Sequence, residues 1–179
     1  MLMLTDYLTP HIFQIAPAAG RLPAVAYNPR KIPAPLYRLL ATKIGHPCVP
    51  LEGMDKPTLA SLLRELRVYA DFGPHPGRDR LPREAALSGA VVITGRRGAA
   101  AFPADVPLPN HFRLDEAAPD FDARLLAVIR NLLQDEEAFL QARAEQQSYR
   151  NWIEANQGAF TREVNGLIAV LTGGTSLAA

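Results

Sequence analysis

Short apolar runs alternate with amphipathic helical segments from residue 23 to residue 114. The strand candidates are AVAY (24–27), VYADFG (68–73) and AVVIT (90–94), and the helix candidates between them are APLYRLLATKIG (34–45), DKPTLASLLRELR (55–67) and PREAALSG (82–89). Alternation of this kind is typical of a parallel sheet whose strands are joined by crossover helices. We therefore predict an α/β fold, a Rossmann-like parallel sheet sandwiched by helices.

The flanking sequence extends this arrangement. A proline-containing run (47–54) predicts a weak strand at a sheet edge, and HFRLD (111–115) predicts a last strand. Helical periodicity follows, with an expected break near Gln134 and Asp135, and the chain is expected to continue as helix after Gly158. We expect a lead-in segment (1–22), a Rossmann-like domain (23–134) and C-terminal helices packed on it (135–179).

Composition and charge exclude several classes of protein. The 179 residues carry a formal net charge of +1, so any basic site must be local. Cys48 is the single cysteine, which rules out an intrachain disulfide, and no apolar run is long enough to span a membrane. GRRG (95–98) lacks the aromatic residues of a nucleic-acid site, and His11, His46 and His111 lack metal-ligand spacing. We expect a cytoplasmic protein without a metal, a nucleic-acid partner or an integral membrane segment.

The predicted topology brings three loops to one rim. In a parallel sheet the ligand binds beyond the carboxyl ends of the strands. The loops 28–33, 73–81 and 95–106 each follow a predicted strand. We expect these three loops to converge.

The residues of these loops suit a diphosphate. Glycine allows close backbone approach, a helix start offers N–H groups, and arginine matches phosphate oxygens with a planar fork. The candidate substrate-binding residues are Arg30, Lys31, Gly73, His75, Gly77, Arg78, Arg80, Glu84 and Arg96. None of the loops matches a P-loop or a Gly-x-Gly-x-x-Gly fingerprint, and no catalytic residue is assigned.

Two of these residues have alternative explanations. Glu84 is expected in the first turn of its helix. A carboxylate there is stabilised by the positive end of the helix dipole, and the alternative is that it accepts hydrogen bonds from a ribose. His75 stands between two prolines, where it contacts the donor, transfers a proton, or is simply an exposed turn residue. The last alternative is favoured. Asp71 is interpreted as a strand-edge carboxylate.

The segments YNPRK (27–31) and DFGPHPGRDRLPREAALSGAVVIT (71–94) resemble the C-terminal, donor-binding half of a GT-B fold glycosyltransferase. The resemblance covers roughly residues 23–115. It implies that Arg30 and Lys31 bind the donor diphosphate, that Glu84 holds the nucleotide ribose, and that the loop 73–77 faces the donor sugar. The family motif has two glutamates, and Pro76 stands where the first would lie.

The resemblance implies hexosyl transfer from a nucleotide sugar, which acts as substrate with no further cofactor. GT-B enzymes bind the acceptor on a second Rossmann-like half, and only residues 1–22 precede the first expected strand. A separate acceptor-domain chain or a second copy of this chain is therefore an expected partner. The alternative is a non-catalytic module that binds a nucleotide, such as a nucleoside diphosphate, or another protein.

Overall fold

The computed structural model describes residues 7–8, 12, 20–77 and 79–172. Its centre is a five-stranded, wholly parallel sheet with the strand order β2-β1-β3-β4-β5. The strands are β1 (Leu22–Tyr27), β2 (Cys48–Pro50), β3 (Leu66–Asp71), β4 (Val91–Gly95) and β5 (Arg113–Leu114). The predicted α/β, Rossmann-like fold is confirmed, including the edge position of the proline-containing β2.

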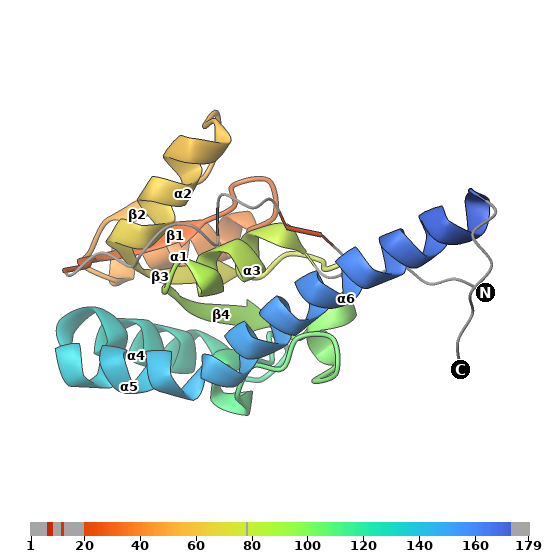
Figure 1. The fold of residues 1–179 in the computed structure, drawn as a ribbon. Coiled ribbons are helices and arrows are strands. Elements are labelled where there is room, and N and C mark those ends of the chain that lie inside the picture. Colours follow the sequence, from red (N-terminus) through yellow and green to blue (C-terminus); the bar gives the residue numbers. More distant parts are fainter. Residues whose placement is uncertain (1–6, 9–11, 13–19, 78, 173–179) are drawn as a thin grey trace.

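Helices cover both faces of the sheet (Figure 1). The α-helices are α1 (Ala34–Lys43), α2 (Lys56–Glu65), α3 (Arg80–Leu87), α4 (Phe121–Gln134), α5 (Glu136–Glu145) and α6 (Gln147–Leu171), and two 3₁₀ turns are η2 (Gly98–Ala101) and η3 (Asn110–Phe112). One face packs against α2, α3 and the start of α6, and the other packs against α1, α4 and α5. The central strands are thus buried on both sides, which explains their continuous apolar runs.

Alternate side chains of each central strand enter opposite cores. Ala26, Tyr69 and Val92 belong to the core beneath α2 and α3. Val25 and Val68 belong to the core beneath α1 and α4. This division follows from the two-residue period of a β-strand.

The helical C-terminal region contains two breaks. The expected break between α4 and α5 is present, and Asp135 caps α5 by accepting from the amides of Glu137 and Ala138. A second break at Gln146 is not predicted by the sequence. The buried Gln146 side chain exchanges two hydrogen bonds with the backbone of Val92, at 2.9 and 2.8 Å, and so completes the open edge of β4.

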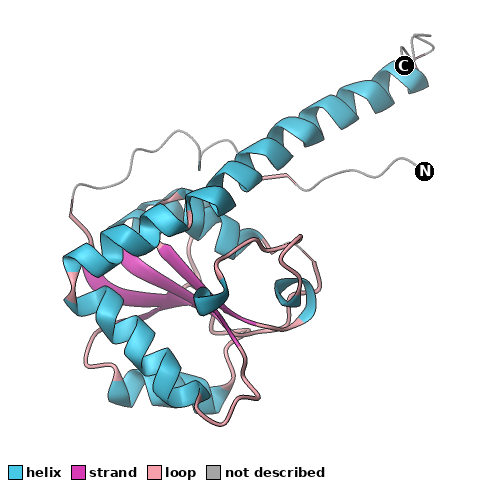
Figure 2. Cartoon of the chain, turned by 90° about the horizontal axis from the view of Figure 1, so that it is seen from below, coloured by secondary structure: helices cyan, strands magenta, loops and turns pink. Residues whose placement is uncertain are grey.

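Helix α6 begins on the body of the molecule and then extends beyond it (Figure 2). Tyr149 and Ile153 near its start are buried in the core beneath α3. Farther along, Gln157 exchanges hydrogen bonds of 2.9 and 3.1 Å with the backbone of Leu8. The last turns expose Ile168 and Leu171.

Candidate functional site

The strand order creates a topological switch point at the carboxyl end of the sheet, between β1 and β3. Helices α1 and α3 follow the neighbouring strands β1 and β3 but pack on opposite faces. The chain therefore turns toward opposite faces of the sheet after these two strands. A reversal of this kind marks the usual ligand position in a sheet of order 2-1-3-4-5.

The three predicted loops do converge at this end. A Cβ added to Gly73 would lie 2.4 Å from the Cβ of Lys31, so the β1 and β3 loops touch where glycine permits it. Gly98 has a φ of +57°, and an added Cβ would lie 2.0 Å from the carbonyl oxygen of His75. The amide of Ala99 donates to that same oxygen at 2.9 Å. We name this convergence of the loops 28–33, 72–79 and 95–101 the carboxyl rim.

A chain of polar side chains runs from the core to the carboxyl rim. The Tyr69 hydroxyl donates to Asp71 Oδ2 at 2.9 Å, and Asp71 Oδ1 lies 3.4 Å from Nε2 of His75. On its other side, His75 Nδ1 lies 3.2 Å from Asp79 Oδ2, and Asp79 also binds the ammonium of Lys31. These residues come from the β1–α1 loop, β3 and the β3–α3 loop, so the row of polar side chains links both loops to the sheet.

Opposite charges help to explain why this row of polar side chains is stable when buried. Burial acts to raise the pKa of Asp71, but the His75 imidazole and the Lys31 ammonium outweigh it, and the net pKa is lowered. Burial and the nearby Asp71 carboxylate raise the pKa of Tyr69, which keeps its hydroxyl protonated as a donor. Asp71 is only 2% exposed. Asp71 is the last residue of β3, as the strand-edge interpretation places it, but its side chain is buried.

His75 also differs from its favoured interpretation. Its side chain is 1% exposed rather than on the surface of a turn. Each ring nitrogen faces a different carboxylate, although neither nitrogen makes a hydrogen bond of good geometry. The flanking prolines are typical of a surface loop, whereas the imidazole is buried between the aspartates at positions i−4 and i+4.

The same residues are the strongest metal-ligand candidates of the described chain. Asp71, His75 and Asp79 each offer a ligand atom, and these atoms lie within 4.8 Å of one another. The imidazole, however, stands between the two carboxylates, and the Lys31 ammonium already binds Asp79. The Lys31 ammonium thus occupies one of the three candidate ligand groups, while both ring nitrogens of His75 remain without a hydrogen-bond partner.

Glu84 lies farther along its helix than the sequence predicts. Helix α3 begins at Arg80, so Glu84 falls in the second turn, and no acidic residue occupies the first. Arg80 Nη2 donates to Glu84 Oε1 at 2.9 Å, and the two side chains are 48% and 9% exposed. The placement in the first turn is therefore wrong. The helix dipole gives a weaker reason for a carboxylate there, because its influence fades after one turn.

The segment after β5 contributes a carboxylate, beside the third loop, that sequence reasoning missed. Glu116 follows β5, and its Oε1 lies so near Gly95 that an added Cβ would be 2.1 Å away. That oxygen is buried without a hydrogen-bond partner, while Oε2 lies 3.5 Å from Arg97. Burial raises the pKa of Glu116 although Arg97 opposes it. Its position directly after the last predicted strand was the available signal.

The remaining predicted residues are held less firmly. Arg30 is exposed, and its backbone amide donates to Oδ1 of Asn28 at 3.0 Å. Arg96 is exposed, and its Nε donates to the Arg113 carbonyl at 2.9 Å. Gly77 is exposed at the tip of the β3–α3 loop. Arg78 lies outside the described residues.

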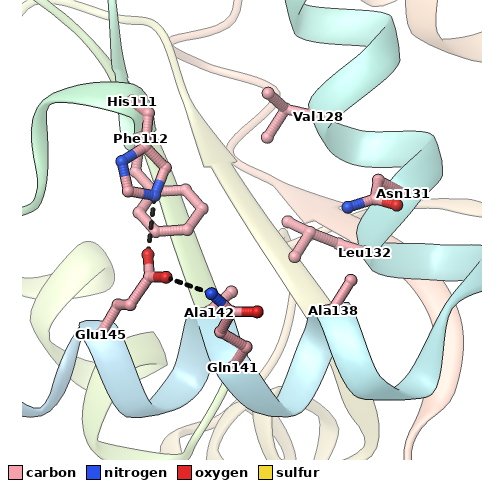
Figure 3. Close-up of a pocket in the computed structure, with 9 residues that line it drawn as sticks. All are labelled: His111, Phe112, Val128, Asn131, Leu132, Ala138, Gln141, Ala142 and Glu145. Atoms are coloured by element: carbon pink, nitrogen blue, oxygen red, sulfur yellow. Dashed lines mark hydrogen bonds and ion pairs between the residues drawn. The ribbon is translucent and has the colours of Figure 1, made fainter.

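Two hollows accompany the sheet. One, of about 200 Å³, lies beside the carboxyl rim between the β1–α1 loop and the start of α4, and Glu116 lines it with Leu36 and Phe121. The other, of about 190 Å³, lies between η3, α4 and α5, as Figure 3 shows. There Glu145 contacts His111 Nε2 at 2.8 Å and Gln141 Nε2 at 3.0 Å. This second hollow contains none of the predicted site residues.

The fold and the carboxyl rim define a Rossmann-like α/β protein with basic and glycine residues at the switch between β1 and β3. No protein-family model matches the chain, and a search of curated proteins finds no match to it. None of the helices in the described ranges combines the length and apolarity needed to cross a membrane.

Proposed function

We propose that the chain binds a nucleotide sugar at the carboxyl rim, as the donor-binding half of a GT-B glycosyltransferase. The observation that carries this proposal is the contact of the basic β1 loop with the glycine-containing β3 loop, at Lys31 and Gly73. The contact lies where sheets of this order bind ligands.

The diphosphate would lie between Arg30, Lys31 and the start of α3. A helix start offers backbone N–H groups and the positive end of the helix dipole. Asp79 occupies the N-cap position of α3 but makes no side-chain cap hydrogen bond, because its carboxylate turns to Lys31 and His75. The diphosphate therefore competes with Asp79 for the Lys31 ammonium.

Glu84 would accept hydrogen bonds from the ribose hydroxyls. Its side chain is nearly buried, and Arg80 holds one carboxylate oxygen at 2.9 Å. A carboxylate fixed in this way is oriented before the ligand binds, which reduces the entropy lost on binding.

In the transfer step the bond from the sugar carbon to the diphosphate breaks, and its electron pair passes to the diphosphate oxygen. Arg30 and Lys31 would stabilise the developing negative charge. The acceptor hydroxyl forms the new bond to the sugar carbon and loses its proton to a base. No residue of this chain is assigned as that base.

A second candidate is a nucleotide-binding or protein-interaction module without catalysis. Two observations favour it. Pro76 stands where the resemblance places the first glutamate of the motif, and Lys31 is engaged by Asp79. The glycosyltransferase half predicts both binding of a nucleoside diphosphate and turnover of a nucleotide sugar. The non-catalytic module predicts no turnover, and it predicts binding of a nucleoside diphosphate when its ligand is a nucleotide.

Calorimetric titration of the full chain with uridine, guanosine and adenosine diphosphates tests the proposal. We expect at least one to bind, and we expect Glu84→Gln to weaken it about tenfold, as loss of one charge-assisted hydrogen bond implies. Glu65→Gln is the matched control, because Glu65 is exposed at the far end of α2.

Absence of binding at millimolar concentration, or equal affinities of Glu84→Gln and wild type, would contradict the assigned site. Hydrolysis of a nucleotide sugar by the chain, measured alongside, separates the enzyme from the non-catalytic module.

A further inference from the structure

Four arginines gather at the amino end of the sheet, opposite the carboxyl rim. Arg21 precedes β1, Arg64 ends α2, Arg143 lies in the last turn of α5, and Arg150 lies in the first turns of α6. We name this group the arginine cluster. Its members come from distant parts of the sequence, so no local sequence motif predicts the cluster.

The cluster surrounds the turn between α3 and β4. Gly89 in that turn has a φ of +88°, and a Cβ added there would lie 2.7 Å from an Nη of Arg21 and 3.0 Å from an Nη of Arg143. Arg150 reaches the same region, since its Nη2 donates to the Arg143 carbonyl at 2.5 Å. At least two guanidinium groups therefore approach one point of the backbone.

Arg21 has a structural role of its own. Its Nη1 donates to the carbonyls of Leu63 and Leu66, at 3.1 and 2.6 Å, and its Nη2 donates to the Ser88 carbonyl. These carbonyls belong to the ends of α2 and α3, which carry partial negative charge. Such bonds explain why one arginine lies here, but they do not explain Arg143 and Arg150 beside it.

Three members of the cluster, Arg21, Arg143 and Arg150, have no close carboxylate in the described part of the chain. No carboxylate there lies within 4.0 Å of the guanidinium of Arg21, Arg143 or Arg150. Burial, followed by repulsion from Arg143, Arg150 and Arg64, lowers the pKa of Arg21 to about 10. Burial and Arg143 also lower the pKa of Arg150, and Glu154 offsets this only in part.

Several donors of the cluster are buried without a hydrogen-bond partner. They are Nε of Arg21, Nε of Arg143 and Nη1 of Arg150, together with the hydroxyl of Ser88 in the same turn. Arg21 is 9% exposed and Ser88 is 1% exposed. Buried donors are normally satisfied, so unmet donors that carry positive charge point to an absent acceptor.

We propose that the arginine cluster binds the phosphate group of a small anionic ligand against the α3–β4 turn. A phosphate supplies the missing negative charge, and its oxygens match guanidinium forks and a hydroxyl donor. The site is at the opposite end of the strands from the carboxyl rim, so it does not depend on the function proposed there.

The thermal unfolding midpoint in sodium phosphate, compared with sodium chloride of equal ionic strength, tests this site. At a phosphate concentration about a hundred times the dissociation constant, we expect the midpoint to rise by roughly 5–10 °C. Arg143→Gln should lose most of this rise. In chloride it should unfold at the wild-type temperature or above, because it removes a repelling charge.

Three further variants make the test specific. Arg150→Gln should behave as Arg143→Gln does, whereas Arg38→Gln, an exposed arginine of α1, should keep the full phosphate effect. Arg30→Gln should keep it as well, which separates the cluster from the carboxyl rim. The proposal is overturned if phosphate has no specific effect on the wild type. It is also overturned if Arg143→Gln and Arg150→Gln retain the full phosphate effect.

Discussion

At the scale of single residues, the buried Asp71 controls the stability of the β3–α3 loop. It accepts from the Tyr69 hydroxyl at 2.9 Å and faces the His75 imidazole at 3.4 Å. Its carboxylate and that of Asp79 together compensate His75 and Lys31. Removal of one member would leave an uncompensated charge in the interior.

We expect Asp71→Asn to lower the free energy of unfolding at pH 7 by about 3 kcal/mol, as broken buried ion pairs do. The pKa of Asp71 is lowered in the folded state, so its stabilisation is fully present above the ordinary aspartate value of about 4. The stabilisation disappears as the pH falls through the lowered value.

Denaturant unfolding between pH 2 and pH 7 measures this difference. The gap between wild type and Asp71→Asn should be widest at neutral pH and should close in acid, whereas exposed Glu65→Gln should follow the wild type. A gap that stays constant across the range would show that the Asp71 charge does not stabilise the loop.

The residue scale also shows where sequence reasoning fails. Lys31, Gly73 and His75 were predicted to meet at one rim, and they do. The burial of His75 was not foreseen, because burial of a titratable group depends on partners that the sequence does not place in space. Glu116 was missed for the same reason.

At the scale of elements, the third loop depends on a glycine in the left-handed region. Gly98 has a φ of +57° and lies against the backbone of His75. We expect Gly98→Ala to lower the free energy of unfolding by about 2 kcal/mol or more, through strain and displacement of the loop. Gly166→Ala, in the open surroundings of α6, should raise it by about 0.5–1 kcal/mol.

Thermal and denaturant unfolding of the two variants measure these opposite effects. If Gly98→Ala unfolds with the same free energy as the wild type, the β4 loop moves freely against the β3 loop. The convergence of the two loops would then not support a ligand site at the carboxyl rim.

Element boundaries were predictable where local chemistry fixes them. Asp55 caps α2 by accepting from Thr58 at 2.9 Å, as its place before the helix indicated. The end of α4 at Gln134 was expected as well. The break at Gln146 was not, because it depends on hydrogen bonds to Val92, a residue 54 positions away. The sequence predicts that α3 begins at Pro82, because proline favours the first turn of a helix, whereas the helix begins at Arg80.

At the scale of the whole molecule, the parallel sheet separates two basic regions. The carboxyl rim holds Arg30 and Lys31 between β1 and β3, and the arginine cluster surrounds Gly89 at the other end of the strands. The net charge of +1 gives no sign of either. Alternation of strands and helices predicted the layers and the rim, but the arginine cluster required the folded chain because its members are scattered along the sequence.

The most direct test of the central claim is to record amide NMR shifts of the isotope-labelled 19.5 kDa chain during titration with a nucleoside diphosphate. We expect the largest shifts in the loops 28–33 and 72–79 and in the first turns of α3, with Arg30→Gln reducing them. Shifts confined to the Gly89 turn or to the hollow between α4 and α5, or no saturable shift at all, would contradict a nucleotide site at the carboxyl rim.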